Sequence, residues 1–442
     1  MTVRPIWIAS RGRALPHGFL FVPECCGLAL PVSFDDKESS CANSTHSSMI
    51  VAVNMIYQVT TVGLNPLQLV LVGTVLEATA FVFEVPTGIV ADVYSRRLSI
   101  IIGYVLIGLG FMLEGLVPRF EAILLAQVIW GIGYTFTSGA SEAWIADEIG
   151  EARAGHAFVR SAQAQQMTAV LGTLAGIVLG SVQINLPIVV GGALTSGIGF
   201  GLMAVMPERG FKPKPRGNRS SFQHMAGTLH DGISMVRRRP ALLTILAIGA
   251  VYGAFSEGYD RLWTAHMLEN FTFPDFAGWQ PVVWLGALRI LLMLLSAAAI
   301  ETVRRRVDTN NHQAVARAMF SLFAVLESGV LLFALAGSFV MAVLATMIAS
   351  VARRISDPFW TAWVNQRLDP QVRATVISMS SQANALGQIA GGPAVGAIGT
   401  FWSLRAALLS SALLLTPVLG LIRYTARRHE RDLVPVLEVS EV

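Results

Sequence analysis

The sequence predicts an all-α polytopic membrane protein with 12 transmembrane helices in two pseudo-symmetric six-helix bundles. Of its 442 residues, 53% are hydrophobic and 14% are charged, whereas an average soluble domain is about 25% charged. Long apolar segments follow one another along the chain, and only helices or closed barrels satisfy their backbone polar groups in lipid. The segments are far too long for barrel strands, so helices are expected. An internal repeat of motifs predicts two related halves.

Eleven apolar segments are long enough to span a membrane, since a helix needs ~20 residues to cross ~30 Å of hydrocarbon. They fall at 66–90, 97–117, 120–145, 156–180, 184–205, 241–262, 281–302, 314–336, 338–363, 374–398 and 400–424. A twelfth helix is expected around 46–63. Its apolar part from Met49 to Val62 has only 14 residues, which is roughly 21 Å at ~1.5 Å per residue.

The first 45 residues are atypical, and we interpret them as an N-terminal extension that need not be ordered. Residues 14–34 are moderately apolar but contain three prolines, and residues 35–48 are polar. A signal peptide is an alternative because arginines precede the apolar run, although no small-residue cleavage site follows. All three cysteines lie in this segment, which leaves no disulfide framework or metal site for the rest of the chain.

Four further segments follow the extension. They are an N-terminal six-helix bundle at 46–205, a basic linker at 206–240, a C-terminal six-helix bundle at 241–424 and a tail at 425–442. Arginine and lysine collect in alternate connections, including the linker and the tail, which predicts that both termini are cytoplasmic. We therefore expect a multi-pass protein of the cell (cytoplasmic) membrane. The net charge of +4 reflects this sorting, so no nucleic-acid partner is expected.

One set of motifs recurs about half a chain later, as a duplicated membrane fold would show. The set is Ala-Trp followed by an aliphatic residue, then Arg-Ala, then Leu-Gly-x-x-Ala-Gly. It occurs at 143–145, 153–154 and 171–176, and again at 362–364, 373–374 and 386–391. The repeat equates the helices that end and begin around these motifs, and it predicts two bundles around a central cavity.

A short charged turn separates the spans at 66–90 and 97–117. It reads Gly88-Ile-Val-Ala-Asp92-Val-Tyr-Ser-Arg96-Arg97. The turn resembles the loop between the second and third helices of the major facilitator superfamily, whose pattern is G-x-L-A-D-R-x-G-R-K. The residues that match are Gly88, Ala91, Asp92, Arg96 and Arg97, and those that depart are Val90, Val93 and Ser95.

The resemblance implies a secondary transporter that works by alternating access, with Asp92 and Arg96 in a cytoplasmic latch. Glu84 lies in Glu-x-Pro-Thr-Gly-x-x-Ala-Asp, which is most similar to the drug-efflux branches of the family. We interpret Glu84 as a carboxylate that holds the cytoplasmic gate with Asp92 and nearby arginines. The fourth helix of proton-coupled members carries an arginine where this chain has Gln127, so coupling through that arginine is not carried over.

Ionisable residues within the spans are the main mechanistic candidates. Each costs ~2.5–3.5 kcal/mol at a helix centre, so these residues must face a cavity or one another. Glu77 and Glu327 are the proton-coupling candidates, because a carboxyl group in a desolvated cavity can load and release a proton. Arg289 and Arg353 are candidates for substrate binding or for counter-charges. The alternative is that one glutamate neutralises one arginine in a locked core.

Two local ion pairs are expected among the other charges. Glu257 with Arg261, and Arg353 with Asp357, are spaced i to i+4, so each pair can close on one face of a helix.

Polar and small residues recur in the repeat-related spans at 156–180 and 374–398. Gln163, Gln166, Gln382 and Asn384 are candidates for binding a substrate, and interhelical hydrogen bonding explains them equally well. A cluster in the later span is interpreted as gating, with static packing as the alternative; it comprises Gly387, Gly391, Gly392 and Pro393.

The function that these observations favour is proton-coupled efflux of small amphipathic or drug-like molecules by a monomeric protein. An importer or uniporter of a small metabolite is one alternative, and a non-transporting membrane receptor or assembly factor is another. The expected partners are a small-molecule substrate, protons and the lipid bilayer. The sequence contains no phosphate-binding loop, metal-binding cluster or nucleophile elbow, so no enzyme, cofactor or metal site is predicted.

Overall fold

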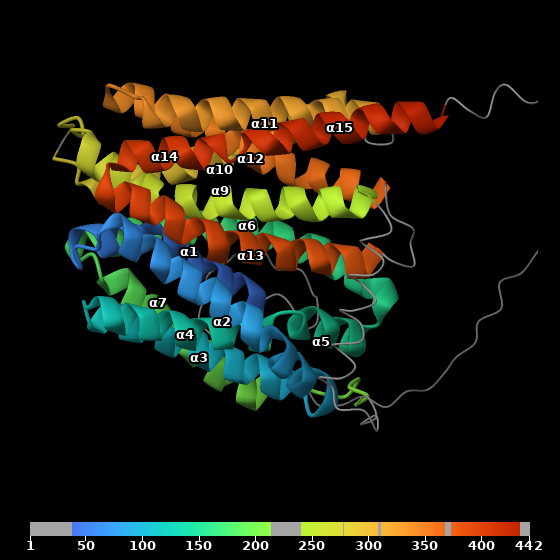
Figure 1. Ribbon diagram of the computed structural model, residues 1–442. Helices are drawn as coiled ribbons and strands as arrows, with labels where there is room; N and C mark the ends of the chain where they lie inside the picture. The colour runs from blue at the N-terminus through green and yellow to red at the C-terminus, as the bar shows by residue number, and fades with distance from the viewer. Residues whose placement is uncertain (1–37, 214–239, 277, 308–310, 367–372, 434–442) are drawn as a thin grey trace, which may run out of the picture. The chain divides into compact units, whose positions relative to one another are not determined.

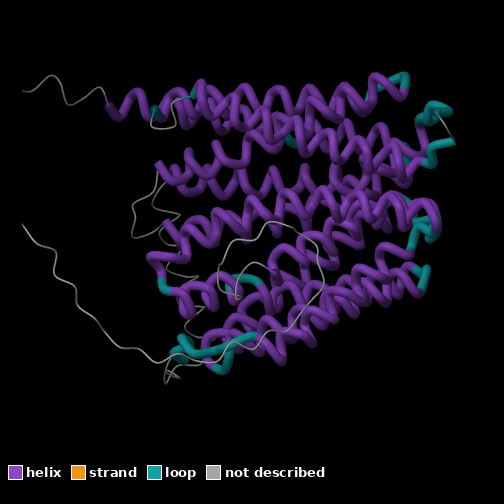
Figure 2. Tube along the Cα trace, turned by 180° about the vertical axis from the view of Figure 1, so that it is seen from behind, coloured by secondary structure: helices purple, strands orange, loops and turns teal. Residues whose placement is uncertain are grey.

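The computed structural model describes residues 38–213, 240–276, 278–307, 311–366 and 373–433. Within these residues the chain is helical and contains no strand. The helices run side by side with the described connections at their ends (Figures 1 and 2). Most of the predicted extension, the greater part of the basic linker and the last residues of the tail lie outside the described residues.

The first half of the chain forms seven helical segments that match the six predicted spans. They are α1 (Glu38–Thr60), α2 (Pro66–Val93), α3 (Arg96–Leu116), α4 (Phe120–Thr137), α5 (Ala140–Ile149), α6 (Glu151–Val182) and α7 (Leu186–Val205). The span predicted at 120–145 is divided into α4 and α5 because Gly139 takes a left-handed φ of 69°, which glycine adopts at little steric cost.

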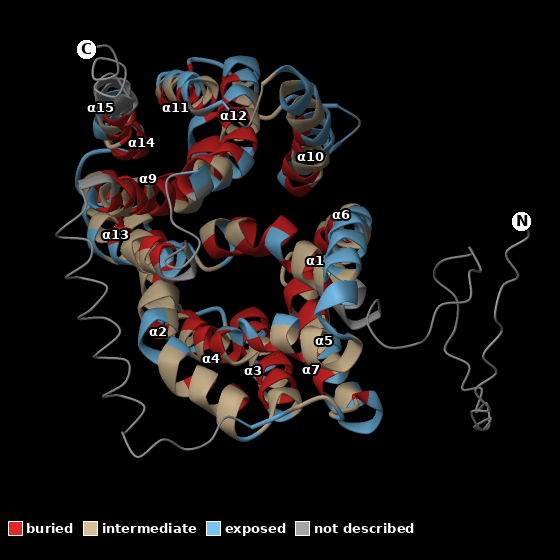
Figure 3. Cartoon of the chain, turned by 90° about the vertical axis from the view of Figure 1, so that its right-hand side faces the viewer, coloured by how far each residue is buried: buried red, intermediate tan, exposed pale blue. Residues whose placement is uncertain are grey.

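The second half is organised in the same way. Its helices are α9 (Pro240–Asn270), α10 (Pro281–Arg306), α11 (His312–Ala334), α12 (Phe339–Gln366), α13 (Arg373–Phe401), α14 (Leu404–Leu413) and α15 (Thr416–Leu433). The last predicted span, 400–424, corresponds to α14 and the start of α15. In Figure 3, α1–α7 gather in one part of the view and α9–α15 in the other.

Ten helical segments among the described residues are long and apolar enough to cross a membrane. The two that fall outside this set, α1 and α13, complete the twelve-helix pattern. Both carry amide side chains that bond to protein groups, such as Gln58 in α1 and Gln388 in α13. The predicted fold class, an all-α polytopic membrane protein with two six-helix halves, is confirmed.

Helix α1 begins at Glu38, inside the segment that the sequence assigned to the extension. The Ser44 hydroxyl donates a hydrogen bond of 3.0 Å to the carbonyl oxygen of Gln165 in α6. Helix α1 is therefore packed on α6 from Ser44 onward, and the part of the extension before Glu38 lies outside the described residues.

Glycines let α6 pack on α1 and α13 pack on α9 at repeat-related positions. A Cβ on Gly172 would overlap the carbonyl oxygen of Thr45, and a Cβ on Gly387 would overlap that of Ala250. One turn later, Gly176 lies against Met49 and Gly391 lies against Ala254. The internal sequence repeat thus corresponds to a repeated close contact between helix backbones.

Contacts between the halves run along α2 and α13. Near the start of α2, the Leu67 amide donates to the Thr400 hydroxyl at 2.9 Å, and a Cβ on Gly396 would lie 3.1 Å from the Cβ of Val70. We call this the far end of the bundle. The opposite end, where the Tyr94–Ser95 turn joins α2 to α3, is called the latch end.

Gly387→Ala should destabilise the protein, because the added methyl group meets the backbone of α9. Overpacking of this kind costs about 1–3 kcal/mol, so the midpoint of thermal unfolding in detergent should fall. The matched control is Gly201→Ala in α7, where nothing lies within 4 Å of the added Cβ. Equal midpoints for the two variants would contradict the close contact of α9 and α13.

Candidate functional site: a charged cavity between the halves

A central cavity of about 580 Å³ lies between the two halves. Its walls come from α1 and α2 in the first half and from α9, α10, α12 and α13 in the second half. This volume falls within the ~300–1,000 Å³ range of small-molecule sites. The cavity can therefore hold a small organic molecule in contact with both halves.

Eight charged side chains line the central cavity, four acidic and four basic. They are Glu77, Glu257, Asp260, Asp357, Arg261, Arg289, Arg353 and Arg354. Such residues are costly within a membrane unless they are paired or face a polar space. The eight comprise two ion pairs and four residues that form neither an ion pair nor a hydrogen bond with described residues.

The first ion pair joins Glu257 and Arg261 along one face of α9, as the sequence predicted. Arg261 Nε lies 3.1 Å from Glu257 Oε1, and the Glu257 side chain is 4% exposed. The pair packs directly on Gly73 of α2, where an added Cβ would overlap the Glu257 carboxylate. Gly392 of α13 contacts the Glu257 side chain from another direction. Two glycines thus make room for a buried ion pair at the contact between halves.

The second ion pair joins α12 to α9 and differs from the prediction. Arg353 binds the Asp260 carboxylate through both terminal nitrogens, one of them at 2.8 Å. Arg353 Nε also donates to the Tyr252 hydroxyl at 3.0 Å. The expected pair of Arg353 with Asp357 does not form, because Asp260 offers bidentate geometry from the neighbouring helix.

The remaining four charged residues are Glu77, Asp357, Arg289 and Arg354. Their side chains make no hydrogen bond or ion pair with any residue that the structure describes. The Nε atom of Arg289 is buried without a partner. Longer-range electrostatic interactions remain, of Glu77 with Arg261 and of Asp357 with Arg353 and Arg354, but the hydrogen-bonding capacity of the four side chains is available to a ligand or a proton.

The α1 wall of the cavity is apolar, whereas the repeat-related wall of α9 is charged. In the glycine contacts, Thr45 of α1 occupies the place that Ala250 occupies in α9, and Met49 the place of Ala254. The same correspondence of positions can be continued along both helices. It pairs Ala52, Met55 and Ile56 of α1 with Glu257, Asp260 and Arg261 of α9, and all six line the cavity. The cavity is thus apolar on one side and charged on the other.

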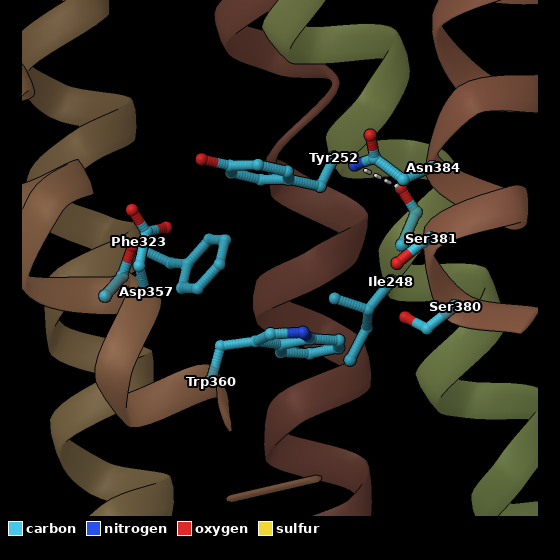
Figure 4. Close-up of a pocket in the computed structure, with 10 residues that line it drawn as sticks. Ile248, Tyr252, Phe323, Asp357, Trp360, Ser380, Ser381 and Asn384 are labelled. Atoms are coloured by element: carbon cyan, nitrogen blue, oxygen red, sulfur yellow. Dashed lines mark hydrogen bonds between the residues drawn. The ribbon is translucent and has the colours of Figure 1, made fainter. Parts of the chain in front are cut away.

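A smaller cavity of about 250 Å³ lies within the second half (Figure 4). Tyr252, Phe323 and Trp360 supply aromatic walls, and Ser380 and Asn384 supply polar groups. Asp357 lines both cavities, so they adjoin at this carboxylate. Of the predicted substrate residues, Asn384 lies here, where its amide donates to the Gly249 carbonyl oxygen at 3.3 Å.

The predicted latch residues gather at the latch end. Arg96 lies 3.8 Å from Asp92, and it also bonds to Asp147 and to the Ala143 carbonyl oxygen, both in α5. Arg97 donates its backbone N–H to Glu208 at 3.0 Å. Gly88 has open space where a Cβ would lie. The motif therefore ties α2 and α3 to α5 and to the chain after α7.

Glu84 has a different partner from the one expected. Its carboxylate accepts a hydrogen bond of 2.6 Å from the Gln382 amide in α13. This bond connects the two halves, whereas the sequence placed Glu84 with Asp92 and the nearby arginines. Two predicted site residues, Glu84 and Gln382, are thus brought together by the fold.

Other predicted residues lie away from the central cavity. Glu327 in α11 accepts a hydrogen bond of 2.6 Å from the Thr416 hydroxyl, beside the break between α14 and α15. Gln163 and Gln166 are exposed on α6 and are not among the cavity-lining residues. The structure brings Glu77, Arg289 and Arg353 together at the central cavity. Glu327, Gln163 and Gln166 lie outside it. Pro393 lies inside α13, within its run of packed glycines.

Sequence reasoning missed a buried polar cluster in the first half. Glu114 in α3 is 1% exposed and accepts hydrogen bonds from Gln58 at 2.6 Å and from Gln127 at 3.1 Å. Gln127 occupies the position where the family motif carries arginine. The signal that could have found the cluster is an isolated glutamate in the apolar span at 97–117. Among the described residues, no group of three His, Cys, Asp or Glu side chains could hold a metal ion.

Comparison with known proteins agrees with this architecture. A model of the Major Facilitator Superfamily matches residues 40–307. A relative in Bacillus subtilis (strain 168), the uncharacterized MFS-type transporter YxaM, is 21% identical over 376 residues, which are 85% of this chain and 91% of YxaM. The family model matches more than half of the chain, and the fold is a helical bundle with a central cavity. Together they indicate a membrane transporter and not an enzyme. The chain belongs to the Major Facilitator Superfamily.

Solved structures share the fold at low sequence identity. The nucleoside transporter NupG aligns with a TM-score of 0.67 at 15% identity, over 89% of this chain and 97% of NupG. A bacterial homolog of the human lysosomal transporter Spinster, in an inward-facing and unoccupied conformation, aligns with a TM-score of 0.69 at 15% identity, over 89% of this chain and 96% of that one.

Arg261→Gln should destabilise the protein strongly, because it leaves the Glu257 carboxylate buried without its cation. Breaking a buried pair from one side costs about 3–5 kcal/mol. The double variant Glu257→Gln with Arg261→Gln should recover most of the loss, as measured by the midpoint of thermal unfolding in detergent.

Glu301→Gln is the matched control, since Glu301 forms exposed ion pairs with Arg304 and Arg305 and should have little effect. Additive losses in the double variant would show that the two residues do not stabilise the fold as a pair.

Proposed function

We propose that this chain is a proton-linked, alternating-access exporter of small amphipathic molecules. The observation that carries the proposal is a cavity lined by both halves, with the unpartnered Glu77 carboxylate facing it. A site shared by two halves can open to either side of the membrane as the halves move. Membership of a transporter superfamily supports the same function.

Glu77 is the proposed proton site. It faces the cavity from α2, and its carboxylate makes no hydrogen bond or ion pair with the described residues. A negative charge there attracts either a proton or a cationic group of the substrate, and occupation by one excludes the other. Such exclusion couples inward movement of protons to outward movement of substrate. Glu327, which bonds to Thr416, is assigned a structural role in this proposal.

The latch end is proposed to be cytoplasmic, with both termini on that side of the cell membrane. Basic residues support this orientation, since Arg96, Arg97 and the Arg304–Arg306 run lie at helix ends on one side of the bundle. In this arrangement the latch and the Glu84–Gln382 bond are the contacts that must change as the cavity opens to the cytoplasm.

An importer or uniporter of a small metabolite is the second candidate, because a cavity lined by both halves serves movement in either direction. Dissipating the proton gradient separates the exporter from a uniporter, which continues downhill exchange, and the direction of net movement separates it from an importer.

Cells that express the full chain should accumulate less rhodamine B, an amphipathic dye with one cationic and one anionic group, than cells with an empty vector, and a protonophore should abolish the difference. Glu77→Gln should lose the protonophore-sensitive export, because the side chain no longer gains and loses a proton. Fluorescence of the cells reports accumulation, and membrane fractions confirm expression. Glu301→Gln, which removes a carboxylate outside the cavity, should export normally. Export that is unchanged in Glu77→Gln would contradict the proton site, and no export by the expressed wild type would contradict the proposed function.

A further inference from the structure

Two unpartnered arginines and two unpartnered carboxylates face one cavity, and this balance points to a substrate with both charges. Arg289 projects from α10 and Arg354 from α12, whereas Glu77 projects from α2 and Asp357 from α12. The other four charged lining residues neutralise each other as Glu257–Arg261 and Arg353–Asp260. The unpaired set has no net charge when all four residues are ionised.

We propose that the substrate is an amphoteric amphiphile, whose anionic group binds Arg289 and Arg354 and whose cationic group binds Glu77 and Asp357. The inference rests on the proposed function and names the chemical class that the same cavity takes. Arginine binds carboxylate or phosphate groups through paired hydrogen bonds, and the buried Nε of Arg289 is such a donor without an acceptor.

The like charges explain why the site needs a ligand. Arg289 and Arg354 repel each other electrostatically, and no described carboxylate forms an ion pair with either. Arg289 is half-buried, whereas Arg354 is exposed to the cavity and interacts with Asp357, and an anionic group that lies between the two guanidinium groups reduces their repulsion. An anionic group on the substrate supplies that charge and gains more than it would in water, because the surroundings are less polar.

The apolar wall defines the rest of the substrate. Ala52, Met55 and Ile56 on α1 face the cavity, and Leu285 and Leu292 on α10 extend this surface. A hydrocarbon or aromatic body buried there contributes about 25 cal/mol per Å² of apolar surface. The substrate is therefore held by its apolar body against α1 and by its two charged groups against the second half and α2.

The amphoteric class also agrees with proton-linked export. The cationic group and the proton compete for Glu77 and Asp357. Substrate that binds while the cavity is open to one side of the membrane therefore displaces protons that bound while it was open to the other side. The anionic group is held by Arg289 and Arg354, whose charge does not change with pH in the physiological range. Arg261 and Glu257 of α9 and Tyr134 of α4 interact with Glu77. Arg353 and Arg354 of α12 and Asp260 of α9 interact with Asp357.

A charge series on one apolar body tests the proposal by binding to the purified full chain. Phenylalanine carries both charges, phenylalaninamide only the cation, N-acetylphenylalanine only the anion, and N-acetylphenylalaninamide neither. Isothermal titration calorimetry in detergent should give phenylalanine a dissociation constant at least roughly tenfold below those of the other three, which corresponds to about 1.4 kcal/mol.

Two variants should each abolish the preference for phenylalanine over the analogue that lacks one of its charged groups. Arg289→Gln should bind phenylalanine no better than phenylalaninamide, because the anionic group has lost its partner. Asp357→Asn should bind phenylalanine no better than N-acetylphenylalanine. The control Arg317→Gln removes a cation from the exposed face of α11, outside the cavity, and should keep the wild-type preference.

The outcomes separate the inference from the proposed function, since binding needs neither transport nor a proton gradient. Equal binding of all four compounds, no saturable binding of phenylalanine, or a preference unchanged in both cavity variants would overturn the inference. A loss of unfolding temperature in Arg289→Gln without ligand would also contradict it, because removing an unpartnered cation should leave the protein at least as stable. A wild type that binds as expected but exports no dye would instead contradict the proposed direction or coupling.

Discussion

The cost of placing charge in a poorly solvated interior determines most of what is specific about this protein. Eight ionisable side chains converge on one cavity, where an isolated charge at a helix centre costs ~2.5–3.5 kcal/mol. Pairing offsets that cost for Glu257–Arg261 and for Asp260–Arg353. The first pair also contacts α2 and α13, and the second joins α9 to α12. The unpartnered residues are tolerated because they face the cavity, where a proton, water or a substrate can reach them.

Glycine packing provides the scaffold on which these charges are held. Gly172 and Gly387 bring repeat-related helix pairs into backbone contact, and Gly73 admits the Glu257–Arg261 pair against α2. The two halves share this packing but differ in the residues that they turn toward the cavity. Where α1 offers Ala52, Met55 and Ile56, α9 offers Glu257, Asp260 and Arg261. A duplicated fold has thus produced an asymmetric cavity with one apolar wall and one charged wall, which is the chemistry that an amphipathic substrate requires.

Much of the fold could be predicted from the sequence, because membrane spans are long, apolar and bounded by charge. The prediction of twelve helices in two halves succeeded for this reason, and the repeat of Leu-Gly-x-x-Ala-Gly located the paired helix contacts. Partners were harder to predict. An i to i+4 spacing correctly gave Glu257–Arg261 but wrongly gave Arg353–Asp357, since Asp260 reaches Arg353 from another helix. The Glu84–Gln382 bond and the Arg96–Asp147 pair likewise join residues far apart in the chain, and one sequence carries no signal of such contacts.

In the proposed mechanism, protonation of Glu77 changes which end of the bundle is open, and pulsed electron–electron double resonance between spin labels measures this change directly. Labels at Leu98 and Ile377 report the latch end, and labels at Leu116 and Trp402 report the far end, at exposed positions of a chain in which Cys25, Cys26 and Cys41 are replaced by serine. Between about pH 8 and about pH 5.5, a range in which a carboxyl group in a cavity can titrate, the two distances should change in opposite directions. In Glu77→Gln both should be independent of pH. Distances that do not respond to pH in the wild type, or that respond equally in the variant, would contradict the account.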